Sequence, residues 1–363
     1  MKLSRWIDQA KKIQSIPSPT FEEAQRAAYL AAQLKELGAP EVEIDGDHNV
    51  LARIPGRSGP PLVVSAHLDS VFPLDTDLTM KATKQTLRGP GIGDNAVAVA
   101  ALIELAHDLL NDPPPGDIWL AGNIGEEGLG NLAGMQTVVK RFGSRPLAYL
   151  VLEGMSLGFV YHRALPIRRY NLEVKTQGGH SWIHAGRPSA AHILLQIGAR
   201  LAQLPLTAEP RTSLNVGRLR GGTSINTIAS HAQMEIELRS EQEALVQSYQ
   251  ATIEEIIDEF KTPIIDLSLT TIGTRPGGAL AADHPLVKAA VQSLQTVGEQ
   301  LVALEIGSTD ASWPLSRGLP SVCVGLTRGG DAHTLHEYIE LDPLARGYQA
   351  LRFLMDAAFE FNP

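Results

Sequence analysis

Residues 61–73 read PLVVSAHLDSVFP, and the first six of them form an apolar run interrupted only by one serine. A short run of this kind is typical of a strand that is buried on both faces of a parallel sheet. His67 and Asp69 follow at the point where such a strand would end. Because open parallel sheets bind ligands at the carboxyl ends of their strands, the stretch predicts both a fold and a functional edge.

The chain continues from this strand in strict alternation. Helix-like and strand-like segments follow one another at residues 94–111 (helix), 117–124 (strand), 131–142 (helix) and 147–154 (strand). This order predicts an α/β fold in which a mostly parallel sheet carries helices on both faces. Upstream, Thr20 and Glu23 match the capping-box pattern and predict the start of another helix.

The pattern changes near Pro166. Six segments between residues 166 and 274 follow the order β-α-β-β-α-β, and their strands alternate apolar with polar residues. Such alternation indicates an antiparallel sheet with one solvated face, and the order is that of a ferredoxin-like α+β unit. The apolar strands then resume, so we expect a small domain at 166–274 inserted into a larger one at 1–165 and 275–363.

Composition narrows the classes of function. The 363-residue chain carries a net charge of −9, and its basic residues are scattered rather than clustered. This argues against a nucleic-acid or anionic-membrane surface. No segment approaches the roughly 20 apolar residues of a membrane span, so a cytoplasmic protein is expected. The single Cys323 lies in a strand-like run and is interpreted as an inert buried thiol.

Acidic and imidazole side chains gather at the predicted strand ends. Each one alone has an ordinary interpretation, as a helix cap or a solvated loop residue. Together, at one sheet edge, they would repel each other or remain unpaired without a cation, which predicts a two-metal site. The candidates are His67, Asp69, Asp94, Glu126, Glu127, Glu153 and His333.

These residue types suit zinc chemistry. Neutral imidazole and carboxylate bind zinc well, and one carboxylate can bridge two ions that activate a water between them. Asp69 lies two residues after His67 and could orient its ring. One of the adjacent Glu126 and Glu127 could bind metal while the other accepts the proton of the water. Spacing alone leaves open which of the two does which.

Four motifs, in this order, resemble those of a known family. They are SAHLDSVFP (65–73), GIGDNAVAV (91–99), GEEGLGN (125–131) and AHTLHEY (332–338). The family comprises zinc-dependent exopeptidases and deacylases, among them glutamate carboxypeptidase, peptidase T, acetylornithine deacetylase and succinyl-diaminopimelate desuccinylase. The resemblance covers nearly the whole chain, including the inserted domain.

The resemblance implies a role for each candidate. Two zinc ions are expected, with cobalt or manganese as possible replacements, and a cis peptide bond should follow the bridging aspartate. The last motif selects His333 over the nearby His336 because the ligand lies four residues before Glu337. The implied roles are His67 and Glu153 on one metal, Glu127 and His333 on the other, Asp94 as the bridge, Glu126 as general base and Asp69 as the orienting residue.

The inserted domain also resembles its family counterpart, which is a lid and dimerisation domain. In GGHSW (178–182), His180 would polarise the scissile carbonyl in the active site of a partner subunit. Asn226 and Arg239 would bind the substrate carboxylate, and an arginine fork suits that group. A plain turn and a solvated surface charge remain the alternatives for these residues.

Two other classes of function fit the sequence less well. GMSLG (154–158) matches the nucleophile elbow of a serine α/β-hydrolase, but β-branched and aromatic residues follow it rather than a helix. A non-catalytic metal-binding protein would be expected to lack a ligand or the base. We therefore expect a homodimeric, carboxypeptidase-like enzyme acting on small peptides or N-acyl amino acids. An aminopeptidase for dipeptides or tripeptides and an N-acyl amino acid deacylase are the alternatives.

Overall fold

A computed structural model describes residues 2–360, and the chain divides into two compact units. The larger unit comprises the chain up to Ala164 and from Gly278 onward, and the inserted unit is Leu165–Gly277. We predicted the divisions after residues 165 and 274. The second division falls later because strand β14 runs on to Arg275.

The larger unit is built on a nine-stranded sheet with the order β1-β2-β6-β3-β7-β17-β8-β15 and with β16 added beside β8. The central strands β6, β3, β7 and β17 are parallel to one another, whereas the pairs at the edges are largely antiparallel. The strands are β1 (Glu41–Ile44), β2 (Val50–Ile54), β3 (Gly59–His67), β6 (Gly116–Asn123), β7 (Tyr149–Glu153), β8 (Phe159–Ala164), β15 (Gly278–Ala279), β16 (Ala303–Gly307) and β17 (Ser321–Gly325).

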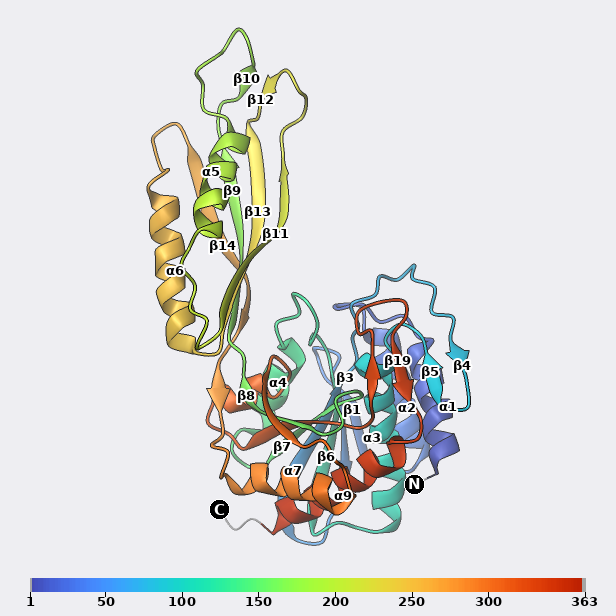
Figure 1. The fold of residues 1–363 in the computed structure, drawn as a ribbon. Helices are drawn as coiled ribbons and strands as arrows, with labels where there is room; N and C mark the ends of the chain where they lie inside the picture. The colour runs from blue at the N-terminus through green and yellow to red at the C-terminus, as the bar shows by residue number, and fades with distance from the viewer. Residues whose placement is uncertain (1, 361–363) are drawn as a thin grey trace. The chain divides into compact units, whose positions relative to one another are not determined.

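Helices cover both faces of this sheet, which confirms the predicted α/β class (Figure 1). Five helices share one apolar core, and two others bury their apolar residues against the opposite face. The first group is α1 (Leu3–Gln14), α2 (Ala24–Glu36), α3 (Val97–Asn111), α7 (Pro285–Thr296) and α9 (Leu344–Phe359); the second is α4 (Ala133–Phe142) and α8 (Ser312–Ser316).

A second, four-stranded sheet of the larger unit has the order β18-β19-β5-β4. Its strands are too short to leave a period in the sequence, and we did not predict them. His333 lies in the connection between β18 and β19, so this sheet supports the last predicted ligand. The strands are β4 (Lys81–Ala82), β5 (Thr86–Arg88), β18 (Gly329–Gly330) and β19 (Tyr338–Glu340).

The inserted unit has the predicted β-α-β-β-α-β order. Its antiparallel sheet runs β11-β13-β9-β14, the strand order of a ferredoxin-like fold, with both helices on one face (Figure 1). A short pair, β10 and β12, is additional to the prediction. The elements are β9 (Ile167–Lys175), β10 (Gly179–His180), α5 (Ala190–Ala202), β11 (Thr212–Gly221), β12 (Thr227–Ile228), β13 (His231–Ser240), α6 (Glu243–Asp258) and β14 (Asp266–Arg275).

The predicted capping box at Thr20 and Glu23 is wrong. Helix α2 begins at Ala24, and the side chain of its cap residue Glu23 makes no capping hydrogen bond. The Thr20 hydroxyl instead donates to the Asp69 carboxylate, 49 residues away in sequence. Glu23 accepts the local N–H of Phe21 at 3.0 Å and the distant N–H of Gly125 at 3.1 Å, neither of which belongs to the helix.

Among residues 2–360, no helix combines the length and apolar character that are needed to cross a bilayer.

Candidate metal centre and active site

His67 ends the central strand β3 and is almost completely buried, with 1% of its surface exposed. Its Nδ1 lies 3.1 Å from the main-chain oxygen of Asp69 and 3.3 Å from the Oδ1 of that residue. Since both neighbours are acceptors, a neutral ring carries its proton on Nδ1. The lone pair on Nε2 is thereby left for a ligand, as expected for a metal-binding histidine.

Asp94 follows a sharp loop at Gly91 and precedes helix α3. The peptide bond from Asp94 to Asn95 is cis, which confirms the prediction from the family resemblance. The Asn95 side chain is fixed to β7 because it donates to the oxygen of Leu152 and accepts from the N–H of Gly154, both at 2.9 Å. The loop of Asp94 is thus tied to the strand that ends in Glu153.

The two carboxylate oxygens of Asp94 face two different histidines. Oδ1 lies 3.0 Å from the Nε2 of His67, and Oδ2 lies 3.1 Å from the Nε2 of His333. A second carboxylate accompanies each histidine: Glu153 is 3.7 Å from His67, and Glu127 is 3.3 Å from His333. The five residues therefore form two His-carboxylate groups that share Asp94.

The donor set fits divalent metal ions. Ligand atoms of His67, Asp94 and Glu127 all lie within 4.8 Å of one another. The Nε2 of His67 is buried and makes no hydrogen bond, although it faces carboxylate oxygens. Two acceptors at this distance repel each other unless a cation lies between them or a proton is added. Imidazole nitrogens and carboxylate oxygens are ligands that zinc accepts.

Proton binding reflects the same crowding of charge. Burial raises the pKa of Glu153 to about 7, against the opposing effect of His67. Burial acts in the same direction on Asp94, but the close imidazole rings of His333 and His67 hold the pKa of Asp94 well below its usual range. Asp94 and Glu127 raise the pKa of His333 to about 10. A metal ion would compete with these protons for the same ligand atoms.

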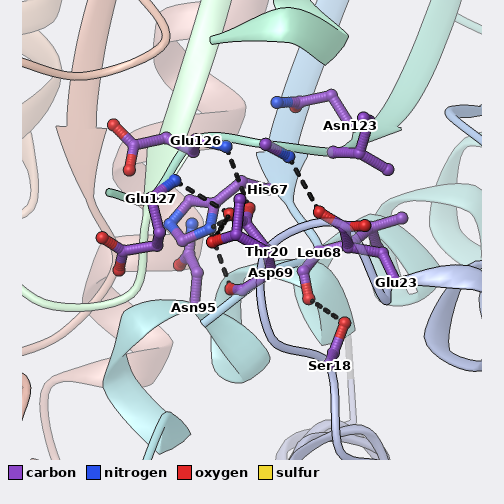
Figure 2. Close-up of polar contacts among 12 residues, drawn as sticks. Ser18, Thr20, Glu23, His67, Leu68, Asp69, Asn95, Asn123, Glu126 and Glu127 are labelled. Carbon is purple, nitrogen blue, oxygen red and sulfur yellow. Dashed lines mark hydrogen bonds and ion pairs between the residues drawn. The ribbon is translucent and has the colours of Figure 1, made fainter. Parts of the chain in front are cut away.

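Glu126 and Glu127 lie in the loop that follows β6, and each has 6% of its surface exposed. Their main-chain N–H groups donate to Asp69, from Glu126 to Oδ1 at 3.0 Å and from Glu127 to Oδ2 at 2.8 Å. Figure 2 shows that the two glutamate carboxylates lie apart while both N–H groups point to Asp69. Glu127 reaches His333, so the geometry associates it with that half of the site.

Two of the three candidates in the inserted unit lie together. His180 is in β10, and the following Ser181 donates its N–H to the oxygen of Asn226 at 2.9 Å. The N–H groups of Trp182 and Ile183 point at the Nδ1 of His180, at 3.2 and 3.4 Å. A neutral His180 ring therefore carries its proton on Nε2, which makes that atom a hydrogen-bond donor.

Arg239 lies apart from that pair. Asn226 precedes the start of β13 at His231, whereas Arg239 lies near the end of that strand. His231 and Arg239 are about 26 Å apart along the strand at a rise of roughly 3.3 Å per residue. The Arg239 guanidinium binds both carboxylate oxygens of Glu237, with Nε at 2.7 Å and one Nη at 2.9 Å. The inserted unit of one chain does not bring Arg239 together with His180 and Asn226.

Sequence reasoning missed the role of Glu337, four residues after His333. This fully buried carboxylate accepts N–H groups from Gly93 at 2.7 Å, from Asp94 at 2.9 Å and from Gly91 at 3.3 Å. Burial, followed by repulsion from Asp94, raises the pKa of Glu337 to about 7. Glu337 thus connects the loop of Asp94 with the loop of His333. Its place in the last motif was the sequence signal that could have revealed this role.

The serine-hydrolase alternative fails on geometry. Residues 154–158 lead into β8, not into a helix, so Ser156 does not occupy a nucleophile elbow. Asp310 and His333 would be the acid and base of a triad with Ser156. Asp310 is fully buried and accepts a hydrogen bond from the amide of Asn123, the last residue of β6, at 2.5 Å.

The fold has close structural counterparts. A tripeptidase from Staphylococcus aureus superposes with a TM-score of 0.83 at 18% sequence identity, over 99% of this chain and 100% of that one. At this identity the likeness establishes the fold, including the inserted unit, and does not establish the substrate.

Sequence comparison gives the family. The chain is 25% identical to a probable carboxypeptidase of Aspergillus flavus over 56% of its own length, and 26% identical to the cytosol non-specific dipeptidase of Escherichia coli over 68%. The matched regions cover 54% and 56% of those relatives, little more than half of each. Residues 63–357, which carry all the metal-site candidates, match the model of Peptidase family M20/M25/M40, and the chain belongs to that family.

Proposed function

We propose that the protein is a di-zinc exopeptidase that hydrolyses the amide bond next to a C-terminal amino acid. The observation that carries the proposal is the division of the site into two His-carboxylate groups on the two oxygens of Asp94. A single-metal site would not need both oxygens of one aspartate to face separate histidines. The paired ligands would be His67 with Glu153 and His333 with Glu127.

Bound zinc would supply Lewis-acid polarisation of the scissile carbonyl and of a water molecule. The chain itself supplies the proton transfers. Glu126 would accept the proton of the attacking water and deliver it to the leaving amine. Asp69 would hold the His67 ring in the tautomer that leaves Nε2 free, because it accepts a hydrogen bond from Nδ1–H.

His180 and Asn226 would act in the active site of a partner subunit, with the inserted unit serving as lid and dimerisation domain. The Nε2–H of His180 would donate to the developing oxyanion, a role that requires the tautomer set by the N–H groups of Trp182 and Ile183. The two ends of β13 are about 26 Å apart, which a small substrate cannot span. This supports the proposal that His180 and Asn226 serve a different active site from Arg239 of the same chain.

Preference for a C-terminal residue rests on three points. Position 153 is a glutamate, which resembles the carboxypeptidases and deacylases of the family more than its aminopeptidases. One curated relative is named as a probable carboxypeptidase. Arg239 would bind the substrate carboxylate. Two of its five N–H groups are taken by Glu237, which leaves three for a ligand.

We also propose a cytoplasmic location and small peptides or N-acyl amino acids as substrates.

An aminopeptidase or dipeptidase is the second candidate, because the other curated relative is a non-specific dipeptidase. The two are separated by mass-spectrometric analysis of products from zinc-loaded protein and a panel of N-blocked peptides, free-amine peptides and N-acyl amino acids. Release of the C-terminal residue from N-blocked peptides supports the proposal. Cleavage of free-amine peptides alone would move the protein to the second candidate.

The proton role of Glu126 is tested by Glu126→Gln, which retains the size of the side chain but removes its basicity. Turnover should fall by about 100- to 10,000-fold. The zinc content and the melting temperature should stay at the wild-type values. A folded, zinc-loaded Glu126→Gln protein with wild-type turnover would show that another group is the base.

A further inference from the structure

Three consecutive main-chain N–H groups in the loop of the proposed base are held by buried carboxylates. Asp69 accepts those of Glu126 and Glu127, and Glu23 accepts that of Gly125 through Oε1 at 3.1 Å. Gly125 has a φ of +66°, a conformation that glycine adopts without strain and that turns the loop sharply. The path of this loop is therefore set by two side chains from elsewhere in the sequence.

The segment of residues 18–26, which carries Glu23, also holds Asp69, as Figure 2 shows. Thr20 donates its hydroxyl to the Oδ2 of Asp69 at 2.9 Å. Ser18 donates to the oxygen of Leu68 at 2.9 Å and accepts the N–H of Ser70 at 2.8 Å. The segment is thus hydrogen-bonded on both sides of Asp69 as well as to it.

The segment also buries one cation close to these two carboxylates. Arg26 is 2% exposed and donates to the oxygens of Leu68 at 2.7 Å and Ile16 at 2.8 Å. Burial lowers the pKa of Arg26 to about 10, against the attraction of Asp69 and Glu23, so the guanidinium remains charged at neutral pH. One buried cation therefore stabilises the two carboxylates that bind the loop.

We propose that residues 18–26 are part of the catalytic apparatus, and that Thr20 and Glu23 are positioning residues for the Glu126 carboxylate. They act through the main chain: Thr20 fixes Asp69, and Asp69 and Glu23 fix the loop that carries Glu126. The inference rests on the proposed function, in which Glu126 is the base. A capping role does not explain these side chains, because α2 starts after them and its N-terminus receives no side-chain cap.

The test uses a pair of substitutions at Thr20. Thr20→Val keeps the shape but removes the hydroxyl, and Thr20→Ser keeps the hydroxyl. In Thr20→Val, kcat should fall by about 10-fold, the lower end of the effect of disturbing a group that supports a metal site. KM, zinc content and melting temperature should not change, and Thr20→Ser should recover most of kcat. Glu22→Gln, at the exposed neighbouring carboxylate, is the matched control and should behave like wild type.

A second measurement separates positioning of the base from a general structural role. In the Glu126→Gln background there is no base to position, so adding Thr20→Val should leave the residual rate nearly unchanged. Independent structural damage would instead multiply the two losses. The same double-mutant comparison, with Glu23→Gln in place of Thr20→Val, tests whether Glu23 also positions the base.

The inference is overturned if Thr20→Val has the wild-type kcat, if Thr20→Ser fails to restore kcat, or if the losses multiply with Glu126→Gln. Loss of zinc or of thermal stability in Thr20→Val would also overturn it, since the residue would then be structural. The outcomes also separate this inference from the function it rests on. A wild-type protein that cleaves nothing in the substrate panel refutes the proposed function, whereas an active wild type with an unaffected Thr20→Val refutes the inference alone.

Discussion

The candidate residues of the larger unit and those of the inserted unit are held in opposite ways. His67 and Asp69 are essentially inaccessible to solvent, and Asp69 alone receives two main-chain N–H groups, a hydroxyl and an imidazole. His180, in contrast, lies on a two-residue strand whose neighbour Trp182 is 85% exposed. The larger unit therefore fixes this buried part of its site before any ligand binds, whereas His333, with 53% of its side chain exposed, is the open part.

The contrast agrees with the chemistry proposed for each unit. Groups that hold metal ions or move a proton must keep their separation within a fraction of an ångström, which requires packed partners. Groups that contact an incoming substrate must be reachable, and exposed loops are where such groups are usually found. Burial also changes proton binding in the larger unit, since it raises the pKa of Glu153 to about 7, and repulsion from Asp94 adds to that rise.

The largest effect is expected at Asp94. Asp94→Ala removes the carboxylate shared by both His-carboxylate groups, so both ions should be held weakly and peptidase turnover should fall at least as far as in Glu126→Gln. Zinc per chain, measured by elemental analysis after gel filtration, should drop from two to one or fewer. Asp75→Ala, an exposed aspartate beyond the first motif, is the control. Two zinc ions retained in Asp94→Ala would refute the shared-ligand geometry.

A large effect on turnover, without loss of zinc, is expected at His180. His180→Ala should lower kcat by about 100- to 1,000-fold, as for loss of an oxyanion donor, with zinc content unchanged. Mixing subunits tests whether His180 acts in its own chain or in the partner. A heterodimer of His180→Ala and Glu126→Gln chains contains one complete site only if His180 works in the partner's site. Recovery of turnover towards half of the wild-type value is therefore expected, and no recovery would place His180 in its own chain's site.

A smaller effect is expected at Arg239. Arg239→Lys retains the charge but loses the fork, so KM for substrates with a free carboxylate should rise by about 10-fold while kcat stays near wild type. C-terminal amides of the same peptides should be affected little. Arg220→Lys, at an exposed arginine on β11, is the control. An equal change in KM for acids and amides would remove Arg239 from carboxylate recognition.

The sequence was informative where a candidate ligand lies at the carboxyl end of a strongly apolar strand. His67 and Glu153 were located in this way, since a buried parallel strand can be recognised from its own residues and its carboxyl end is a defined edge. The cis bond after Asp94 came from the family resemblance alone, because no local propensity indicates it.

The incorrect prediction of a capping box has a physical cause, which is that the deciding partners are distant in sequence. Thr20 and Glu23 satisfy a helix-capping pattern, and only the folded chain reveals that Asp69 and Gly125 are their partners. Glu237 is a different case. It lies two residues before Arg239 on one face of a strand, so their ion pair could have been predicted from strand periodicity.

The two-metal site is tested by the crystal structure of the zinc-loaded protein, with the ions located by anomalous scattering at the zinc edge. Two ions are expected, roughly 3.5 to 4 Å apart, with one oxygen of Asp94 on each. His67 and Glu153 should bind one ion, and His333 and Glu127 the other. A single ion, or two ions without Asp94 between them, would contradict the central claim.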